Sequence, residues 1–183
     1  MKIRLASNLQ SDSIVDGEGI RTVIWTQGCS HNCPGCHNPA THDFNGGFLT
    51  DTDEINKELS LLQAQTGITF SGGDPLFQVE DCTEIAKHAK KIGMDVWCYT
   101  GFTFEELIKS KKNIEFLKYV DVLVDGKFIM AERSLNVDFR GSRNQRIIDV
   151  PASLEVGEVV LIPKYIGERY VDVSIPKKEY IYI

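Results

Sequence analysis

Short apolar runs alternate with amphipathic stretches along most of this chain, and no other feature limits its possible folds so strongly. The apolar runs have the length and the β-branched content of buried strands. Strands are expected at residues 21–28, 67–73, 94–101, 120–126 and 145–151. Because strands that alternate with helices pair in parallel through right-handed crossovers, the pattern predicts an α/β fold.

The amphipathic stretches between these strands have the apolar spacing of helices that cover a sheet. Helices are expected at residues 52–65, 79–93, 102–110 and 113–120. Asp51 or Thr52 is suited to cap the first helix, and Gly93 is suited to end the second. The predicted architecture is a partial (β/α) barrel of about five to six parallel strands with the helices outside.

We expect this barrel to occupy residues 1–154 and a different kind of structure to follow it. Residues 155–183 are rich in β-branched and aromatic side chains, contain two prolines and show no helical period. They predict a small β-rich C-terminal extension of unknown role. Its composition does not decide whether it covers an edge of the sheet or contacts a partner.

Charge and hydropathy narrow the range of partners and locations. The 183 residues include 20 Lys and Arg against 26 Asp and Glu, which gives a formal charge of −6, and no long basic run interrupts this balance. Nucleic acid is therefore not an expected partner, because backbone binding depends on clustered positive charge. No apolar stretch approaches the roughly 18 residues of a membrane span, and the N-terminus has no signal-like apolar core. The expectation is a cytoplasmic protein that has no membrane partner.

The cysteines are the most informative side chains. Three of the five lie within eight residues, as Cys29, Cys33 and Cys36 in a C-x3-C-x2-C pattern. Thiolates are soft ligands, and three on a short loop can bind three corners of one 4Fe-4S cluster. Cys82 and Cys98 lie far along the chain, so one iron would stay free for an exogenous ligand.

The spacing alone leaves three other interpretations open. Zinc binds sites of three cysteines and one histidine, which His31 or His37 could complete. Cys33 and Cys36 also form a C-x-x-C pair, as in thioredoxin-like dithiols. The cysteines could finally be ordinary core residues, although the surrounding prolines and glycines are typical of a loop.

Other unusual residues follow the predicted strands. In parallel sheets the ligand site lies at the carboxyl ends of the strands. The cysteines follow the first expected strand, 71–75 (Ser-Gly-Gly-Asp-Pro) follows the second, 99–101 (Tyr-Thr-Gly) the third, and 125–126 (Asp-Gly) the fourth. Four loops are therefore expected to converge on one mouth.

The cysteine pattern after one strand, with Gly72-Gly73-Asp74-Pro75 after the next, resembles the radical S-adenosylmethionine superfamily. Within it, the closer similarity is to the family of activating proteins of anaerobic ribonucleoside-triphosphate reductases. The residues that carry this second resemblance lie at 16–21, 28–29, 31, 34–36, 38, 71–76, 124–126 and 140–142. The resemblance covers about residues 10–150.

The resemblance implies a 4Fe-4S cluster with three cysteine ligands and S-adenosyl-L-methionine as cofactors. Reductive cleavage of S-adenosylmethionine would give a 5′-deoxyadenosyl radical, which removes hydrogen from a glycine of the reductase and leaves a glycyl radical. The implied partners are the anaerobic reductase and a reduced flavodoxin or ferredoxin-type electron donor. Two alternatives are an activase of another glycyl-radical enzyme, such as pyruvate formate-lyase, and a radical S-adenosylmethionine enzyme that acts on a small molecule.

The resemblance also assigns roles to residues, with no catalytic side chain beyond the cluster and S-adenosylmethionine. Gly72 and Gly73 would let the backbone approach the methionyl amino group. Gly35, Cys36 and His37 would pass near the adenine, although His37 replaces an aromatic residue that is common in the family.

Two aspartates are further candidates for cofactor binding. Asp74 would accept a hydrogen bond from the methionyl ammonium or fix the turn with Pro75. Asp125 follows a later strand and would meet ribose, a carboxylate or the partner, or else form a local salt bridge. The same alternatives apply to three nearby residues, Arg140, Arg143 and Asn144.

The remaining prominent side chains within the expected strands are predicted to be structural. Trp25, Phe70 and Trp97 are expected to be core residues rather than cofactor contacts. Cys98 is expected to be a small buried apolar residue, and Cys82 is given no role.

Overall fold

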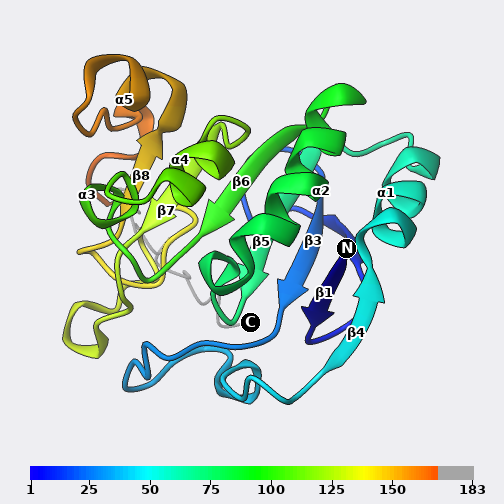
Figure 1. Cartoon of the computed structure of the whole chain (residues 1–183). Coiled ribbons are helices and arrows are strands. Elements are labelled where there is room, and N and C mark those ends of the chain that lie inside the picture. The colour runs from blue at the N-terminus through cyan, green and yellow to red at the C-terminus, as the bar shows by residue number, and fades with distance from the viewer. Residues whose placement is uncertain (169–183) are drawn as a thin grey trace, which may run out of the picture.

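The structure is a computed structural model and describes residues 1–168. A single mixed sheet of eight strands forms its centre, with the order β4-β1-β3-β5-β6-β7-β8 and with β2 paired to β3 (Figure 1). The strands are β1 (Lys2–Leu5), β2 (Gln10–Ser13), β3 (Arg21–Thr26), β4 (Phe48–Asp51), β5 (Gly67–Gly72), β6 (Asp95–Tyr99), β7 (Val122–Asp125) and β8 (Arg146–Asp149). The α-helices are α1 (Thr52–Leu61), α2 (Val79–Lys91), α3 (Phe104–Leu107), α4 (Lys111–Leu117) and α5 (Val150–Val156). Short 3-10 helices are η1 (Pro39–Thr41), η2 (Pro75–Gln78), η3 (Met130–Glu132) and η4 (Pro163–Tyr165).

The α/β prediction is confirmed at the centre of the sheet. Strands β3, β5, β6 and β7 run parallel and coincide with the first four expected strands. Helix α2 connects β5 to β6, and α3 and α4 connect β6 to β7. In Figure 1, α1, α2 and α4 lie over the same side of the sheet, so their apolar residues share one core with the strands.

The predicted five to six parallel strands exceed the number that pair in parallel, because within the described sheet only β3, β5, β6 and β7 are joined by parallel pairing. Strand β8 forms where a strand was expected, but it pairs antiparallel with β7, with Val124 opposite Ile147. Parallel pairing needs a crossover, usually helical, that carries the chain back across the sheet. Between β7 and β8 the chain forms only η3 and loops, so β8 starts from the end at which β7 stopped.

The other edge of the sheet was not predicted. Strand β1 pairs antiparallel with β3, β4 pairs antiparallel with β1, and β2 pairs antiparallel with β3. Each of these three strands has only four residues, and β2 exposes three of its four. Strand β2 is entirely polar, and the alternation of apolar residues in β1 extends over only four residues, which is too short to identify a strand in sequence.

The helix ends follow the expected capping chemistry. The Asp51 carboxylate accepts a hydrogen bond from the backbone N–H of Asp53 and so caps α1, as predicted. Helix α2 ends at Lys91, and Gly93 takes a left-handed conformation with φ of +85° two residues later. The Thr103 side chain and Glu106 form a capping box at α3.

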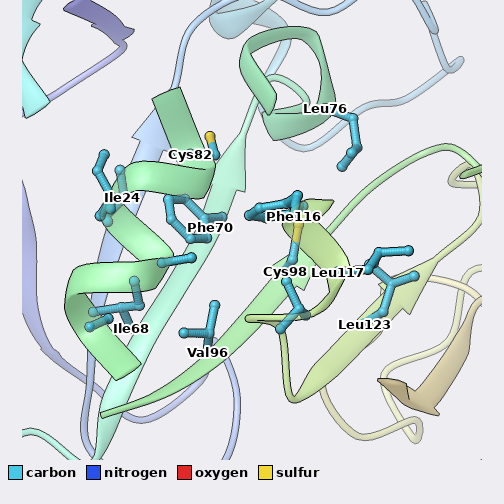
Figure 2. Close-up of a cluster of buried hydrophobic side chains, with 14 of the residues drawn as sticks. Ile24, Ile68, Phe70, Leu76, Cys82, Val96, Cys98, Phe116, Leu117 and Leu123 are labelled. Atoms are coloured by element: carbon cyan, nitrogen blue, oxygen red, sulfur yellow. The ribbon is translucent and has the colours of Figure 1, made fainter. Parts of the chain in front are cut away.

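The main core lies between the sheet and the helices (Figure 2). The rings of Phe70 and Phe116 pack edge to face with centroids 5.7 Å apart. Cys82 and Cys98 are both fully buried in this core, so the prediction for Cys98 is confirmed. Trp97 is buried on the opposite face of the sheet.

The predicted boundary at residues 154 and 155 falls inside α5. The described part of the expected extension contains an isolated bridge between Ile148 and Leu161 and then η4. Tyr165 of η4 packs against Trp97 and Phe139 on the second face of the sheet. The rest of the predicted β-rich extension, 169–183, lies outside the described residues. Within residues 1–168, no helix is both long and apolar enough to cross a membrane.

Candidate functional site

The loop that carries the three cysteines leaves β3 and is closed at its base by the backbone. Gly28 donates its N–H to the carbonyl of Thr41 at 2.8 Å, and Cys29 donates to the carbonyl of His42 at 3.1 Å. Residues 28–42 therefore form a loop whose two ends are joined at the carboxyl end of β3, where the sequence predicted the site.

Within the loop, Cys29, Cys33 and Cys36 are all partly exposed and carry free thiols. A tight turn brings the backbone N–H of Cys36 to the carbonyl of Cys33 at 3.1 Å, with Gly35 at φ of +74° inside it. Burial raises the pKa of the Cys29 thiol above its usual value. The Cys36 sulfur lies 3.3 Å from Nε2 of His42 and accepts the Asn38 N–H at 3.4 Å.

The exit of β5 is joined directly to this loop. Gly73 donates to the carbonyl of Thr26 at 2.8 Å, and Asp74 donates to that of Gly28 at 2.9 Å. A Cβ on Gly73 would lie 2.4 Å from the Gly28 carbonyl oxygen, and one on Gly72 would lie 2.4 Å from that of Thr26. The close backbone approach of β5 to β3 therefore requires both glycines, independently of any cofactor.

The Asp74 side chain is buried and joins three segments. Its carboxylate accepts the N–H of Leu76 at 2.9 Å, which caps η2, and the N–H of Gly101 at 2.9 Å. The Thr100 hydroxyl donates to the same group at 2.9 Å. Nε2 of His31, in the cysteine loop, lies 2.7 Å from it. These contacts support the turn-fixing interpretation of Asp74 and show how the cysteine loop is held against β5 and β6.

A cavity of about 400 Å³ opens beside the cysteine loop. It is lined by Val15, Asp16, Trp25, His37, Asn38, Ser71, Tyr99, Phe128, Phe139, Arg140, Gly141 and Gln145. The His37 and Phe128 rings lie 4.8 Å apart, and a Cβ on Gly141 would lie within 3.0 Å of both. The cavity thus combines aromatic walls with a few polar groups, as ligand sites generally do.

Asp125 lies away from this cavity. Its buried carboxylate accepts the N–H of Phe104 at 2.8 Å and Nε–H of Arg146 at 2.9 Å, and Arg146 also binds Glu105. Asp125 therefore forms the local salt bridge that the sequence left as one alternative.

The three residues grouped with Asp125 lie in different surroundings. Arg140 lines the cavity and donates to the backbone carbonyls of Tyr165 and Gly167 at 2.8 and 2.9 Å. Arg143 pairs with Glu168 at 2.6 Å, and Asn144 donates to the carbonyl of Lys127 at 2.8 Å. Only Arg140 of these three borders the cavity.

Comparison with known proteins identifies the family. Residues 15–148 match the 4Fe-4S single cluster domain family. The anaerobic ribonucleoside-triphosphate reductase-activating protein of Haemophilus influenzae is 36% identical over 142 residues, which cover 73% of this chain and 90% of that protein. The chain belongs to the anaerobic ribonucleoside-triphosphate reductase-activating protein family. The predicted resemblance is therefore confirmed.

Two further relatives carry the same name and support the same family assignment. The activating protein of Enterobacteria phage T4 is 36% identical over 141 residues, with 73% of this chain and 86% of that protein covered. That of Escherichia coli K12 is 35% identical over 141 residues, with 72% and 90% covered. Among solved structures, QueE from Escherichia coli matches with a TM-score of 0.48 and 14% identity over 56% of this chain and 54% of that one, which is too low to support an inference.

In this activating-protein family member, the cysteine loop fits a 4Fe-4S cluster. It offers three partly exposed thiols, while the other two cysteines of the chain are buried in the core. Within residues 1–168, no three His, Cys, Asp or Glu side chains gather closely enough for one metal ion. A cuboidal cluster does not need such convergence, because each thiolate binds a different iron. The family match favours this cluster over the zinc and dithiol alternatives.

The cavity likewise fits a cofactor of nucleoside size. It is within the range of about 300–1,000 Å³ that is common for small-molecule sites. It is continuous with the cysteine loop through His37 and Asn38, which directly follow Cys36. Gly35, by contrast, is exposed and does not line the cavity, and a Cβ there would overlap the end of the Met130 side chain.

Several residues of this site were not predicted from the sequence. Trp25 was expected in the core, but it is only partly buried and lines the cavity, with Nε1 donating to Gln10 at 2.9 Å. Phe70 and Trp97 are buried, as expected. Ser71 and Tyr99, which the sequence placed among the loops at the ends of the strands, also line the cavity. Along β5 and β6 they alternate with core residues, so they point to the opposite face of the sheet.

Proposed function

We propose that this protein activates an anaerobic ribonucleoside-triphosphate reductase. The chemistry that a 4Fe-4S cluster and S-adenosyl-L-methionine supply when bound is reductive cleavage to a 5′-deoxyadenosyl radical, which takes hydrogen from a glycine of the reductase and leaves a glycyl radical there. The family membership supports this function, since its relatives carry the name of reductase-activating proteins.

The observation that carries the proposal is the position of the anchored cysteine loop beside the cavity at the carboxyl ends of β3, β5 and β6. In α/β sheets this end is where ligands bind. Cys29, Cys33 and Cys36 are the proposed cluster ligands. The cavity next to Cys36 would then hold S-adenosylmethionine in direct contact with the cluster.

The chain's own residues bind and orient the two cofactors in this proposal. The Gly72 and Gly73 backbone borders the methionyl end, where their missing side chains let β5 approach the loop. Cys36 and His37 border the adenine end, with the Phe128 ring opposite His37.

The predicted role of Gly35 near adenine also remains part of the proposal. Asp74 acts indirectly, by holding His31 and the turn after β5. For Asp125 we propose a positioning role, because Phe104 and Arg146 already bind its carboxylate.

The partner and the setting follow from the same proposal. The substrate is the reductase, and the electron comes from a reduced flavodoxin or a ferredoxin-type protein. We further propose a cytoplasmic location, a sheet curved as a partial (β/α) barrel, and a separate role for residues after 154.

The proposal is tested with protein reconstituted anaerobically with iron and sulfide. Incubation with S-adenosylmethionine and dithionite should yield 5′-deoxyadenosine and methionine in equal amounts. With an anaerobic reductase added, electron paramagnetic resonance should show a glycyl radical on the reductase. Absence of both products with a fully loaded cluster and the reductase present would refute the function.

Matched cysteine variants test the ligand assignment in the same assay. Cys33→Ala should lose the cluster and both products, because it removes one of three thiolates. Cys98→Ala should keep both, since Cys98 is buried in the core on β6. Equal iron loss in the two variants would contradict the assignment.

The same preparation separates the two alternative functions. A glycyl radical on pyruvate formate-lyase but not on the reductase would indicate a different activase. Cleavage of S-adenosylmethionine with no radical on either protein would favour a small-molecule substrate.

A further inference from the structure

His42 contacts the first and the last of the three cysteines through different atoms. Its backbone carbonyl accepts the N–H of Cys29 at 3.1 Å, and its ring Nε2 lies 3.3 Å from the sulfur of Cys36. Its own N–H is directed to the carbonyl of Pro39 at 3.3 Å, at the end of η1. The backbone of His42 is therefore anchored at the base of the loop, and its ring lies beside one of the three sulfurs.

The direction of the ring hydrogen bond follows from the chemistry of a ligating cysteine. A sulfur bound to iron is a thiolate and has no proton to donate. The imidazole must therefore donate its Nε2–H to the Cys36 sulfur. The Asn38 backbone N–H donates to the same sulfur at 3.4 Å, so Cys36 receives a side-chain donor in addition to a backbone donor.

Donors at a cysteine sulfur affect the cluster that the sulfur binds. Hydrogen bonds to the sulfurs are among the factors that set the reduction potential of iron–sulfur clusters. One-electron reduction adds negative charge to the cluster and its thiolates. A donor beside the sulfur stabilises the reduced form more than the oxidised form, and thus raises the potential.

We propose that His42 is a positioning residue that raises the reduction potential of the cluster through its hydrogen bond to Cys36. This inference rests on the proposed function, and it adds a residue that controls how readily a flavodoxin or ferredoxin-type donor delivers its one electron. The electron enters the cluster, and the imidazole keeps its proton throughout.

The expected effect is about a tenfold change in the ratio of reduced to oxidised cluster at a fixed potential. A tenfold change in this ratio corresponds to a shift of about 59 mV in the midpoint potential of a one-electron couple. Replacement by a residue of similar shape without a donor should therefore make the midpoint potential more negative by about that amount.

The test is an anaerobic redox titration of the reconstituted full chain, without S-adenosylmethionine, followed by electron paramagnetic resonance. His42→Phe removes the donor, and His42→Gln retains an N–H. His88→Phe is the matched control, because His88 lies on α2 and contacts Ser60 at 2.8 Å. The inference predicts a lowered potential in His42→Phe, less than half of that shift in His42→Gln, and none in His88→Phe.

Equal potentials in the unmodified protein and His42→Phe, at equal iron content, would overturn the inference and leave the proposed function intact. Absence of a reducible cluster from the unmodified protein would overturn both. If His42→Phe does not retain iron, the inference is tested instead on the unmodified protein labelled with ¹⁵N-histidine. Pulsed resonance should then show a ¹⁵N nucleus coupled to the reduced cluster and lost in His42→Gln, and absence of that coupling would overturn the inference.

Discussion

Replacement of Asp74 by alanine should destabilise the whole protein, although Asp74 lies in the segment expected to bind a cofactor. The carboxylate is 1% exposed and is the acceptor for the backbone N–H groups of Leu76 and Gly101. It is also the partner of the Thr100 hydroxyl and the His31 ring. The Asp74→Ala variant leaves all four groups without this acceptor.

The size of the effect follows from these contacts. A buried donor left without an acceptor costs about 1–3 kcal/mol. Two backbone N–H groups therefore give about 2–6 kcal/mol, and loss of the pair with His31 adds to this. We expect the free energy of unfolding to fall by about 3–7 kcal/mol, a large part of the roughly 5–15 kcal/mol typical of a domain.

The assay is urea unfolding of the cluster-free protein under reducing conditions, followed by circular dichroism. Asp53→Ala is the matched control, because Asp53 is exposed in the first turn of α1 and should lose no more than about 1 kcal/mol. The iron content after reconstitution should also fall in Asp74→Ala, since His31 anchors the cysteine loop to this carboxylate. A free energy of unfolding within about 1 kcal/mol of the unmodified protein would show that the network does not stabilise the fold.

Three further outcomes are expected. Gly73→Ala should lower both stability and iron uptake, because its Cβ would lie 2.4 Å from a backbone oxygen, and unchanged urea unfolding would argue against that constraint. Trp25→Ala should weaken S-adenosylmethionine binding to the reconstituted protein about tenfold by calorimetry, at about 1.4 kcal/mol per factor of ten, while leaving iron content unchanged. Glu105 has its pKa lowered to about 2, chiefly because Arg146 donates to its carboxylate. This lowered pKa stabilises the fold above the ordinary pKa of 4.5 and ceases to do so as the pH falls towards 2. The unfolding free energies of unmodified protein and Glu105→Gln should therefore differ by less than about 1 kcal/mol at pH 7 and converge below pH 4, and a difference that grows with acid would contradict the assignment.

The sequence was sufficient to predict the central strands, because each is a short, largely buried apolar run. α-Helices follow only β5 and β6, whereas the cysteine loop follows β3 and η3 follows β7. The sequence could not give the direction of β8, which depends on the path of the chain after β7 rather than on the residues of β8. Helix α5 was missed for a different reason. The strand expected at 145–151 covered its first two residues and the β-rich extension expected from 155 covered its last two. The helix begins after the Asp149 cap with Pro151 in its first turn, and it ends at Gly157 in a left-handed conformation.

The candidate site was predictable to the extent that it is local in sequence. The three cysteines follow one another on a single loop, so their spacing was enough to single them out as candidate ligands, while the choice of cluster over zinc or a dithiol came from the family resemblance. The contact of His42 with Cys36 depends on the path of the loop through η1. This path has no helical or strand period, so it could not be predicted from the sequence. Asp125 followed the expected strand, but its cationic partner, Arg146, lies on β8, whose antiparallel direction was not predicted.

The backbone bonds at the base of the cysteine loop change what loss of the cluster would mean for the chain. The backbone N–H groups of Gly28 and Cys29 donate to the carbonyls of Thr41 and His42 without any metal. The entropy cost of closing the loop is therefore part of folding and not of cluster binding. Zinc fingers, by contrast, unfold when the metal leaves, because the metal itself closes their loops. If oxygen destroyed the cluster, the cluster-free protein would therefore stay folded. Rebuilding the cluster would then require iron and sulfide but no refolding of the chain.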